Sequence, residues 1–395
     1  APEQILYKKI TDTLFPDTIY SVESGGDPDV IPQLTYAQFL DFHRKYYHPS
    51  NSYIYLYGNM DVAEKLAFID EAYLCQFDNT RVDSAIAKQA PFAHTSVTRG
   101  EYPIGNDDRE DNAAYMAYSW VVGDSLDAKL CLGFQILEYA LMEAPGAPLK
   151  QALLDKGFGE DIYGMFETSL IQPYLSIIIK NINEEDRDEI VQVIQTELKK
   201  LADGGLNHKT LEGALNYYEF KSREGDFGRW PKGLMYGLQL MDSWLYDDNK
   251  PFVHLKFQAV YDELREGLSK GYFDDLIRHY MIDNTHCSVY LLCPSKGLAA
   301  RKEQALAGQL AEYKASLSEE ELEQLIAATE ELKQYQSEPS PKEILEMIPL
   351  LTIDDIRKEA EPIYNKVLSE EGIAILQHEI ETNRIAYVDL LFDIS

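Results

Sequence analysis

The segment from Tyr20 to Asp61 reads YSVESGGDPDVIPQLTYAQFLDFHRKYYHPSNSYIYLYGNMD and specifies a loop, a helix, a turn and a strand. Ser24 to Pro28, SGGDP, is turn chemistry, because Gly and Pro adopt backbone angles that other residues resist. Thr35 and Gln38 have the spacing of a capping box, which predicts a helix start. The aromatic residues that follow recur at helical intervals: Phe39, Phe42 and Tyr46.

The second half of the segment predicts the end of that helix and a strand. Pro49 in HPSN cannot continue the helical ladder and restricts the residue before it. Residues 53–57, YIYLY, then predict a strand that Gly58-Asn59 closes.

This segment closely resembles the zinc metallopeptidases of the pitrilysin and insulinase clan (inverzincins), in their presequence-protease, falcilysin-like branch. The resemblance continues in collinear order over nearly the whole chain. The words that carry it are SGGDP, IPQLTY, FHRKYYHPSN and LYGNMD between 24 and 61, GAPLKQALLDKGFGEDIYG (146–164), GDFGRWPKGLMYGLQLMDSWLYDD (225–248), QLIAATEELKQYQ (324–336) and IPLLTIDDI (348–356).

The zinc motif of that clan is missing from this sequence. The family binds zinc through an HxxEH helix, whose two His hold the metal while the Glu acts as general base, and through a glutamate downstream. None of the eight His frames such a motif, and HEIET at 378–382 has Thr where HExxH needs its second His. The resemblance places the third-ligand glutamate just before Ala1 to Leu6, so we expect the chain to begin immediately after the zinc site.

The C-terminal end of the sequence also predicts a domain that continues beyond this chain. Residues 385–392, IAYVDLLF, form a β-prone apolar run, and a strand needs a partner. In the family, the corresponding segment opens a third domain, and a fourth carries the Arg and Tyr that contact substrate. We therefore expect these 395 residues to be the central part of a longer enzyme.

The resemblance and the composition together predict five parts. They are the C-terminal part of a first, catalytic-type peptidase domain (1–78), a linker (79–108), a second peptidase-like α+β domain (109–295), a helical hairpin connector (296–342) and the start of a third domain (343–395). The hairpin rests on a run of good helix formers with a capping box at Ser318 and Glu321. Its alternative is an ordinary αα-hairpin within one domain.

The order of elements predicts an α+β fold in which helices back antiparallel sheets. Predicted strands lie at 113–122, 162–166, 174–179 and 286–292. Predicted helices lie at 2–14, 62–73, 208–224, 232–246, 252–268 and 272–282, with others capped by Asp127 and Asn183.

The composition argues against some classes of function. The formal net charge of −31 argues against nucleic-acid binding, which requires Lys and Arg to neutralise phosphates. This acidity either attracts basic peptides or simply keeps the protein soluble. No apolar run reaches the roughly 20 residues that span a bilayer, and we expect no membrane partner. The four Cys form no CxxC pair and predict buried thiols of a reducing compartment. An acidic chain without eukaryotic targeting marks favours the bacterial cytoplasm.

The function that the resemblance implies is zinc-dependent endoproteolysis of unfolded peptides inside an enclosed chamber. This chain would form chamber wall and hinge, its partners being those peptides and the remaining domains of the same polypeptide. No catalytic or metal-binding residue is assigned within it, no cofactor is expected in it, and its peptide-binding residues are left open. The alternatives are a non-catalytic subunit or a peptide-binding scaffold that pairs with a zinc-bearing partner.

A few single residues carry competing interpretations. His48, before Pro49, is interpreted as a turn residue rather than a ligand, and His279 with His286 as structural residues rather than a metal pair. Trp230 and Trp244 either pack in the core or between domains, or line a wall that contacts peptide.

Overall fold

The computed structural model describes residues 1–356, 358–360, 362 and 364–394. The chain divides into two compact units, Ala1–Lys296 and Gly297–Ser395. The first unit is built around a five-stranded sheet, whereas the second contains long helices and a two-stranded hairpin.

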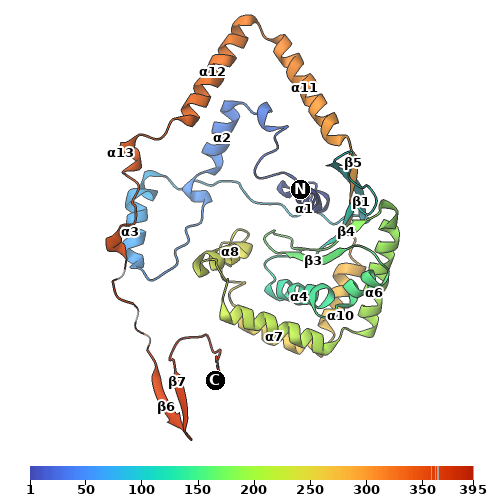
Figure 1. The fold of residues 1–395 in the computed structure, drawn as a ribbon, viewed down its shortest axis with the longest axis vertical. Coiled ribbons are helices and arrows are strands. Elements are labelled where there is room, and N and C mark those ends of the chain that lie inside the picture. The colour runs from blue at the N-terminus through green and yellow to red at the C-terminus, as the bar shows by residue number, and fades with distance from the viewer. Residues whose placement is uncertain (357, 361, 363, 395) are drawn as a thin grey trace. The chain divides into compact units, whose positions relative to one another are not determined.

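The five-stranded sheet organises the first unit (Figure 1). Its strands are β1 (Ser96–Ile104), β2 (Ala114–Val121), β3 (Asp161–Glu167), β4 (Tyr174–Ile182) and β5 (Cys287–Lys296), and their order across the sheet is β1-β5-β2-β4-β3. The predicted α+β fold and the antiparallel pair β3–β4 are confirmed. The sheet departs from purely antiparallel pairing at one edge, where β1 and β5 run parallel.

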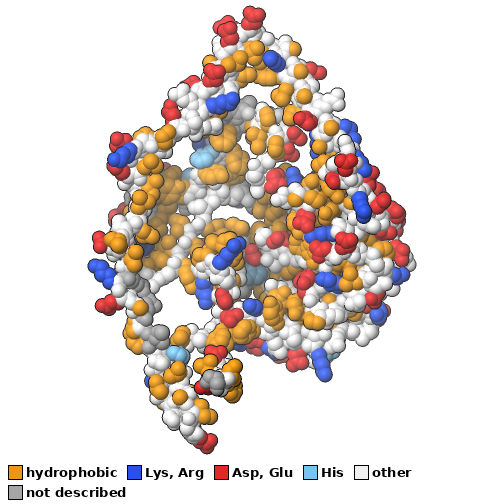
Figure 2. Space-filling view, in the orientation of Figure 1, with side chains coloured by type: hydrophobic (Ala, Val, Ile, Leu, Met, Phe, Trp, Pro, Cys, Tyr) orange, Lys and Arg blue, Asp and Glu red, His pale blue; other side chains and the backbone are white. Residues whose placement is uncertain are grey.

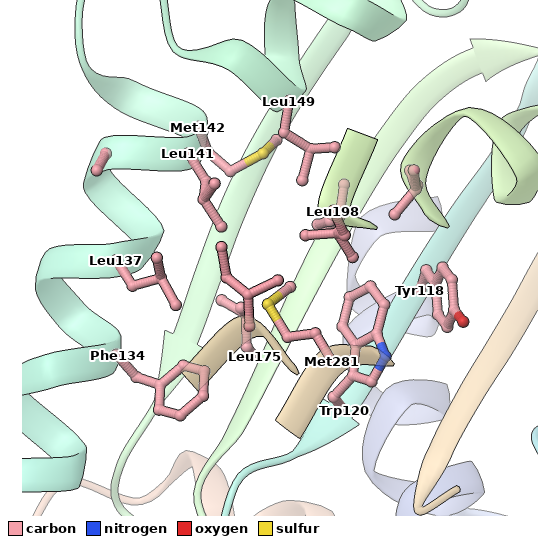
Figure 3. Close-up of a cluster of buried hydrophobic side chains, with 14 of the residues drawn as sticks. Tyr118, Trp120, Phe134, Leu137, Leu141, Met142, Leu149, Leu175, Leu198 and Met281 are labelled. Atoms are coloured by element: carbon pink, nitrogen blue, oxygen red, sulfur yellow. The ribbon is translucent and has the colours of Figure 1, made fainter. Parts of the chain in front are cut away.

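Helices cover one face of this sheet. They are α4 (Ala128–Glu138), α5 (Pro148–Asp155), α6 (Arg187–Gly204), α7 (His208–Glu224), α9 (Phe257–Leu268) and α10 (Tyr272–Ile277), and α4 and α10 each continue into a π-helical turn, Tyr139–Glu143 and Arg278–Ile282. Trp120 of β2, Phe134 of α4 and Leu198 of α6 are fully buried between them (Figure 3). Because alternate strand residues point to opposite faces, only every second residue of each strand joins this cluster.

The opposite face of the sheet is covered by α1 (Pro2–Leu14). Leu6, Ile10 and Leu14 recur at intervals of four and are buried against Ala117 and Tyr290 of the sheet. The predicted helix at 2–14 is therefore confirmed. Its apolar stripe packs on β2, which begins about a hundred residues later in the chain, and on β5, which begins about 270 residues later. The predicted boundary between 1–78 and 109–295 stays a prediction.

The segment that specified the fold forms its predicted helix but not its strand, and the helix predicted directly after it is also present. α2 (Tyr36–Tyr46) begins at the predicted capping box, with the Gln38 amide donating to Oγ1 of Thr35 at 3.2 Å, and α3 (Val62–Ala72) follows. Neither helix contains a buried residue. The strand predicted at 53–57 is wrong, because no described strand lies beside it to complete a hydrogen-bonded ladder.

The second unit contains two long helices and a β-hairpin. α11 (Leu298–Ser316) and α12 (Glu319–Ser337) are joined at the capping box predicted from Ser318 and Glu321, and α13 (Lys342–Leu345) follows. Neither α11 nor α12 has a buried residue. Strands β6 (Lys366–Glu370) and β7 (Ile373–Gln377) pair antiparallel.

A second predicted strand, at 385–392, is also wrong. Leu391 and Phe392 are 93% and 79% exposed, and no described strand pairs with this segment. An extended apolar segment without a neighbouring strand has no ladder to join.

Three of the four cysteines agree with the prediction of buried thiols. Cys131, Cys287 and Cys293 are buried free thiols as predicted, whereas Cys75 is free and exposed. Within the described ranges, none of the helices combines the length and the apolar character that a membrane span requires. Hydrophobic side chains nevertheless reach the surface in many places (Figure 2).

Candidate functional site

The strand β3 forms one open edge of the main sheet. It pairs with β4 on one side, and no described strand pairs with the other. Its interior residues, Ile162 to Phe166, carry no charge, whereas the opposite edge strand, β1, carries Arg99 and Glu101 beside each other. Charged side chains protect sheet edges against strand addition. The β3 edge is therefore the one that is better suited to accept an extended peptide.

Glu138, the last residue of α4, lies directly against this edge strand. It is only 9% exposed, although it is ionisable. A Cβ atom placed on Gly164 of β3 would overlap Oε1 of Glu138 and lie 2.8 Å from its Cδ. Glycine at position 164 thus leaves the space that the carboxyl group occupies.

A cluster of three tyrosines begins at Tyr139, the residue after Glu138. Tyr139 stacks on Tyr217 at a ring distance of 5.6 Å and meets Tyr218 edge-on at 5.9 Å. Burial raises the pKa of Tyr218, and the nearby charge of Glu138 adds to that increase. Of these tyrosines, Tyr218 therefore lies close enough to Glu138 to interact with its charge.

Two buried acids near β3 have raised pKa values. Burial raises the pKa of Glu138 to about 7, with a further contribution from Glu143. Burial also raises the pKa of Asp242 to about 6, although Oγ1 of Thr168 donates a hydrogen bond to its Oδ2 at 2.9 Å. Both groups resist ionisation because their charged forms would lose hydration.

The raised pKa of Glu138 predicts a loss of stability with rising pH. Between its ordinary pKa of 4.5 and about 7, the folded protein keeps a proton that the unfolded chain releases, so the free energy of unfolding falls as pH rises. We expect Glu138→Gln to stabilise the protein at pH 8 but hardly at pH 4.5, by at most about 3 kcal/mol. Urea unfolding of the variant and the parent at both pH values measures this difference.

Glu212 on α7 is an exposed acid and provides the matched control for that measurement. Glu212→Gln removes a carboxyl group that is not buried, so it should not give the added stability at pH 8 that is expected of Glu138→Gln. An identical response of the two variants would contradict the assignment of the pH dependence to burial of Glu138.

A second feature joins α8 (Lys232–Trp244) to residues 53–57, and we call it the tyrosine–glycine joint: Tyr53, Tyr55 and Tyr57 against Gly233, Gly237 and Trp244. A Cβ on Gly233 would lie 2.8 Å from Cγ of Tyr57, and one on Gly237 would lie 2.9 Å from Cε1 of Tyr55. Tyr55 and Tyr57 are two residues apart, which spans about 6.6 Å in an extended chain. Gly233 and Gly237 are four residues apart, which spans about 6 Å along a helix, so each tyrosine can lie against one glycine.

The third contact of the joint is polar as well as aromatic. The ring of Tyr53 lies 4.5 Å from that of Trp244, and its hydroxyl donates a hydrogen bond to Oδ1 of Asp248 at 2.6 Å. Burial, followed by this hydrogen bond, raises the pKa of Tyr53 to about 12. The joint therefore links segments that are about 180 residues apart in the sequence and fixes residues 53–57, which pair with no described strand, against α8.

A surface cavity of about 820 Å³ lies between α1 and residues 19–24. Its charged residues are mostly paired, since Lys8 lies 3.9 Å from Glu23, and Asp12 lies 2.7 Å from Lys9. The cavity therefore offers little uncompensated charge to a ligand.

The structure places the histidines that the sequence singled out in structural roles. Nδ1 of His48 accepts a hydrogen bond from the Ser50 amide at 3.2 Å, as expected of a turn residue. Nδ1 of His279 lies 2.8 Å from the Asp275 carbonyl oxygen, and Nε2 of His286 lies 2.9 Å from the Leu14 carbonyl oxygen. Each of the three rings is therefore engaged with backbone.

The two tryptophans that the sequence singled out, Trp230 and Trp244, lie in different environments. Trp244 belongs to the tyrosine–glycine joint, which agrees with packing between segments. Trp230 is 52% exposed, and the guanidinium of Arg229 lies over its ring at 5.1 Å. Neither tryptophan approaches β3 through any contact that the structure shows.

The part of the chain that the structure describes shows no site for the zinc that the resemblance implies. Among residues 1–356 and the described residues beyond, no group of three or more His, Cys, Asp or Glu side chains is arranged to hold a metal ion. The sequence also contains no HxxEH motif. No catalytic step through zinc is therefore assigned to this chain.

Comparison with known families decides the relationship. Residues 33–218 match the family described as Peptidase M16 inactive domain. Residues 292–395 match a second family, described as associated with the C subfamily of the M16 peptidases.

The chain belongs to the M16 peptidase family.

Curated relatives of this M16 chain are longer proteins. Protein HypA of Clostridium perfringens is 42% identical over 393 residues, which cover 100% of this chain and 40% of that protein. Presequence protease 1, chloroplastic/mitochondrial, of Arabidopsis thaliana is 34% identical over 404 residues, covering 100% of this chain and 37% of that protein. The M16 chain thus spans about two fifths of the length of these relatives.

Solved structures agree on the fold. A protease from Helicobacter pylori superposes with a TM-score of 0.52 at 16% identity, covering 74% of this chain and 67% of that one. A peptidase M16 inactive domain from Pseudomonas fluorescens gives a TM-score of 0.51 at 14% identity, covering 75% and 66%. At such identities the likeness concerns the fold alone, and it matches the predicted helix-backed sheet.

Proposed function

We propose that this M16 chain is the wall and hinge of a zinc-dependent endopeptidase that degrades unfolded peptides in an enclosed chamber. One observation carries the proposal: the whole chain aligns with about two fifths of a presequence protease, yet its sequence contains no HxxEH. In this proposal zinc is held by residues outside the chain, and the residues described above bind and orient the peptide.

The role of this chain toward the peptide rests on the β3 edge. An extended peptide can add to an open sheet edge through main-chain hydrogen bonds, which do not depend on its sequence. A folded protein cannot offer such a free backbone strand, so addition at this edge favours unfolded substrates. The uncharged interior of β3, from Ile162 to Phe166, supports this choice of edge.

The hinge part of the proposal rests on α11 and α12. These two helices of 19 residues each connect through the capped turn at Ser318 and have no buried residue of their own. Amphipathic helices gain most of their stability from packing, so we propose that the remaining domains of the same polypeptide cover them. The bacterial cytoplasm is the compartment proposed for the whole enzyme, and neither nucleic acid nor membrane is proposed as a partner.

The test separates the chain from the metal-binding part. We expect the purified 395-residue chain with added zinc to show no metal-dependent cleavage of an unfolded peptide, because it lacks the ligands and the base. A polypeptide that also includes the HxxEH segment encoded upstream in the same reading frame should cleave it, and chelation should abolish that activity. Chelator-sensitive turnover by the 395-residue chain alone would refute the proposal.

One alternative has an observation in its favour. The family matched at 33–218 is described as an inactive domain, which suits a non-catalytic subunit paired with a zinc-bearing chain. The coding sequence discriminates between the two: an HxxEH in the same frame removes this alternative, whereas an HxxEH only in a separate gene supports it.

A further inference from the structure

The buried carboxyl group of Glu138 has no evident role in holding the core of the first unit together. It sits at the end of a helix whose neighbouring residues Ile136, Leu137 and Ala140 are buried and apolar. Among the described residues, no hydrogen bond or ion pair satisfies it. A carboxyl group that is nine-tenths buried without a charged partner is costly, so its position calls for a function.

The geometry directs this carboxyl group at the β3 edge. Ile162 and Phe166 of β3 pack into the cluster formed with α4, so Gly164, between them in the alternation, faces the same side. Since Gly164 has no side chain, the carboxyl group of Glu138 occupies that place and reaches the strand backbone. A larger residue at position 164 would fill the space through which the carboxyl group of Glu138 reaches β3.

A peptide added to β3 would bring its own side chain to the same point. Residues opposite each other on neighbouring strands have Cβ atoms about 5 Å apart and point to the same face. The peptide residue opposite Gly164 would therefore point toward the helix-covered face, where Glu138 lies and where Tyr139 and Tyr218 pack. A carboxylate beside tyrosine rings suits an ammonium or guanidinium group, through ion pairing and cation–π contact.

We propose that Glu138, acting across Gly164, is a specificity-determining residue that selects a Lys or Arg side chain in a peptide added to β3. This inference rests on the proposed function, because it requires strand addition at that edge. It assigns the basic side chain to one position of the peptide and leaves the positions on either side unselected.

The test compares two fluorescein-labelled nine-residue peptides of alternating Thr and Val that differ only at the central residue, Lys or Gln. Fluorescence anisotropy measures their binding to the 395-residue chain at pH 8. We expect the Lys peptide to bind about tenfold more tightly, as hydrogen bonds to a charged partner allow. Glu138→Gln should reduce that ratio to about one and leave binding of the Gln peptide unchanged.

Two further variants sharpen the result. Glu143→Gln removes a neighbouring exposed acid and should keep the preference for Lys. Gly164→Ala should abolish the preference, because its Cβ would displace the carboxyl group of Glu138. Circular dichroism spectra that match the parent at pH 8 show that each variant is folded.

The outcomes distinguish selection of the basic side chain by Glu138 from strand addition at β3. Equal binding of both peptides by the parent chain, or a Lys preference that survives Glu138→Gln, overturns this inference and leaves strand addition standing. A Lys preference that is insensitive to N-methylation of the peptide backbone, or no binding of either peptide, overturns strand addition at β3 and this inference with it.

Discussion

Replacement of Trp120 by Ala is expected to destabilise the first unit by about 3–5 kcal/mol, the range found for deleting a large aromatic side chain from a core. Trp120 is fully buried on β2, the central strand of the sheet. Its ring stacks on Tyr118 at 3.9 Å and lies beside Met281 (Figure 3). Because β2 is hydrogen-bonded to β4 on one side and to β5 on the other, the structure can collapse only partly into the cavity.

Tyr118→Phe is the matched control for this prediction. It keeps the stacked ring and removes only the hydroxyl group, which accepts a hydrogen bond from Nε2 of Gln195 at 3.2 Å. That loss is expected to cost about 1 kcal/mol. Urea unfolding followed by circular dichroism compares the two variants, and a cost for Trp120→Ala no larger than that of Tyr118→Phe would show that the core does not depend on this ring.

Substitution of Gly233 by Ala is expected to release residues 53–57 from α8. Alanine is the better helix former by about 1 kcal/mol, so α8 itself should gain. Its Cβ, however, would lie 2.8 Å from Cγ of Tyr57, at the root of the ring, and rotation of the ring cannot relieve that overlap. Overpacking of this kind costs about 1–3 kcal/mol, so the open form of the tyrosine–glycine joint should become about 10- to 100-fold more populated.

Cleavage by chymotrypsin after Tyr53, Tyr55 or Tyr57 measures that opening. Gly213→Ala on α7 is the matched control, because a Cβ there would meet no atom within 4 Å and only the gain in helix propensity remains. Cleavage of the Gly233→Ala variant at the rate of the Gly213→Ala variant would contradict the role of the glycine in the joint.

Local signals predicted the helices well. Thr35 with Gln38 and Ser318 with Glu321 determine helix starts through side chains three residues apart, and both capping boxes are present. The helix predicted over 252–268 begins only at Phe257, because turns occupy the residues after Pro251. The β6–β7 hairpin was missed, although Glu371 and Gly372, both with positive φ, form the two-residue turn that such hairpins use.

The prediction of strands would have required information about residues far apart in the sequence. Residues 53–57 and 385–392 have strand composition, but a strand exists only where another strand offers its backbone. The edge position of β3 likewise follows from the order β1-β5-β2-β4-β3, which no short stretch of sequence encodes. The candidate peptide-binding residues could therefore not be chosen from the sequence.

Two signals for the candidate site were nevertheless present. Glu138 follows the apolar pair Ile136 and Leu137 on α4, and Gly164 interrupts a strand of bulky residues. An isolated glycine within a strand indicates close approach of another group. Neither signal identified the other residue as its partner, since they come together only when α4 packs on β3.

The parallel pairing of β1 with β5 has a consequence for biosynthesis. β5 is the last strand of the sheet to be made, yet it lies between β1 and β2, the first two. A nascent chain on the ribosome must therefore keep these two early strands apart, with their inner edges unsatisfied, until about 175 further residues have emerged after β2. Pairings of such long sequence separation form slowly, and the incomplete sheet is exposed to aggregation in the meantime.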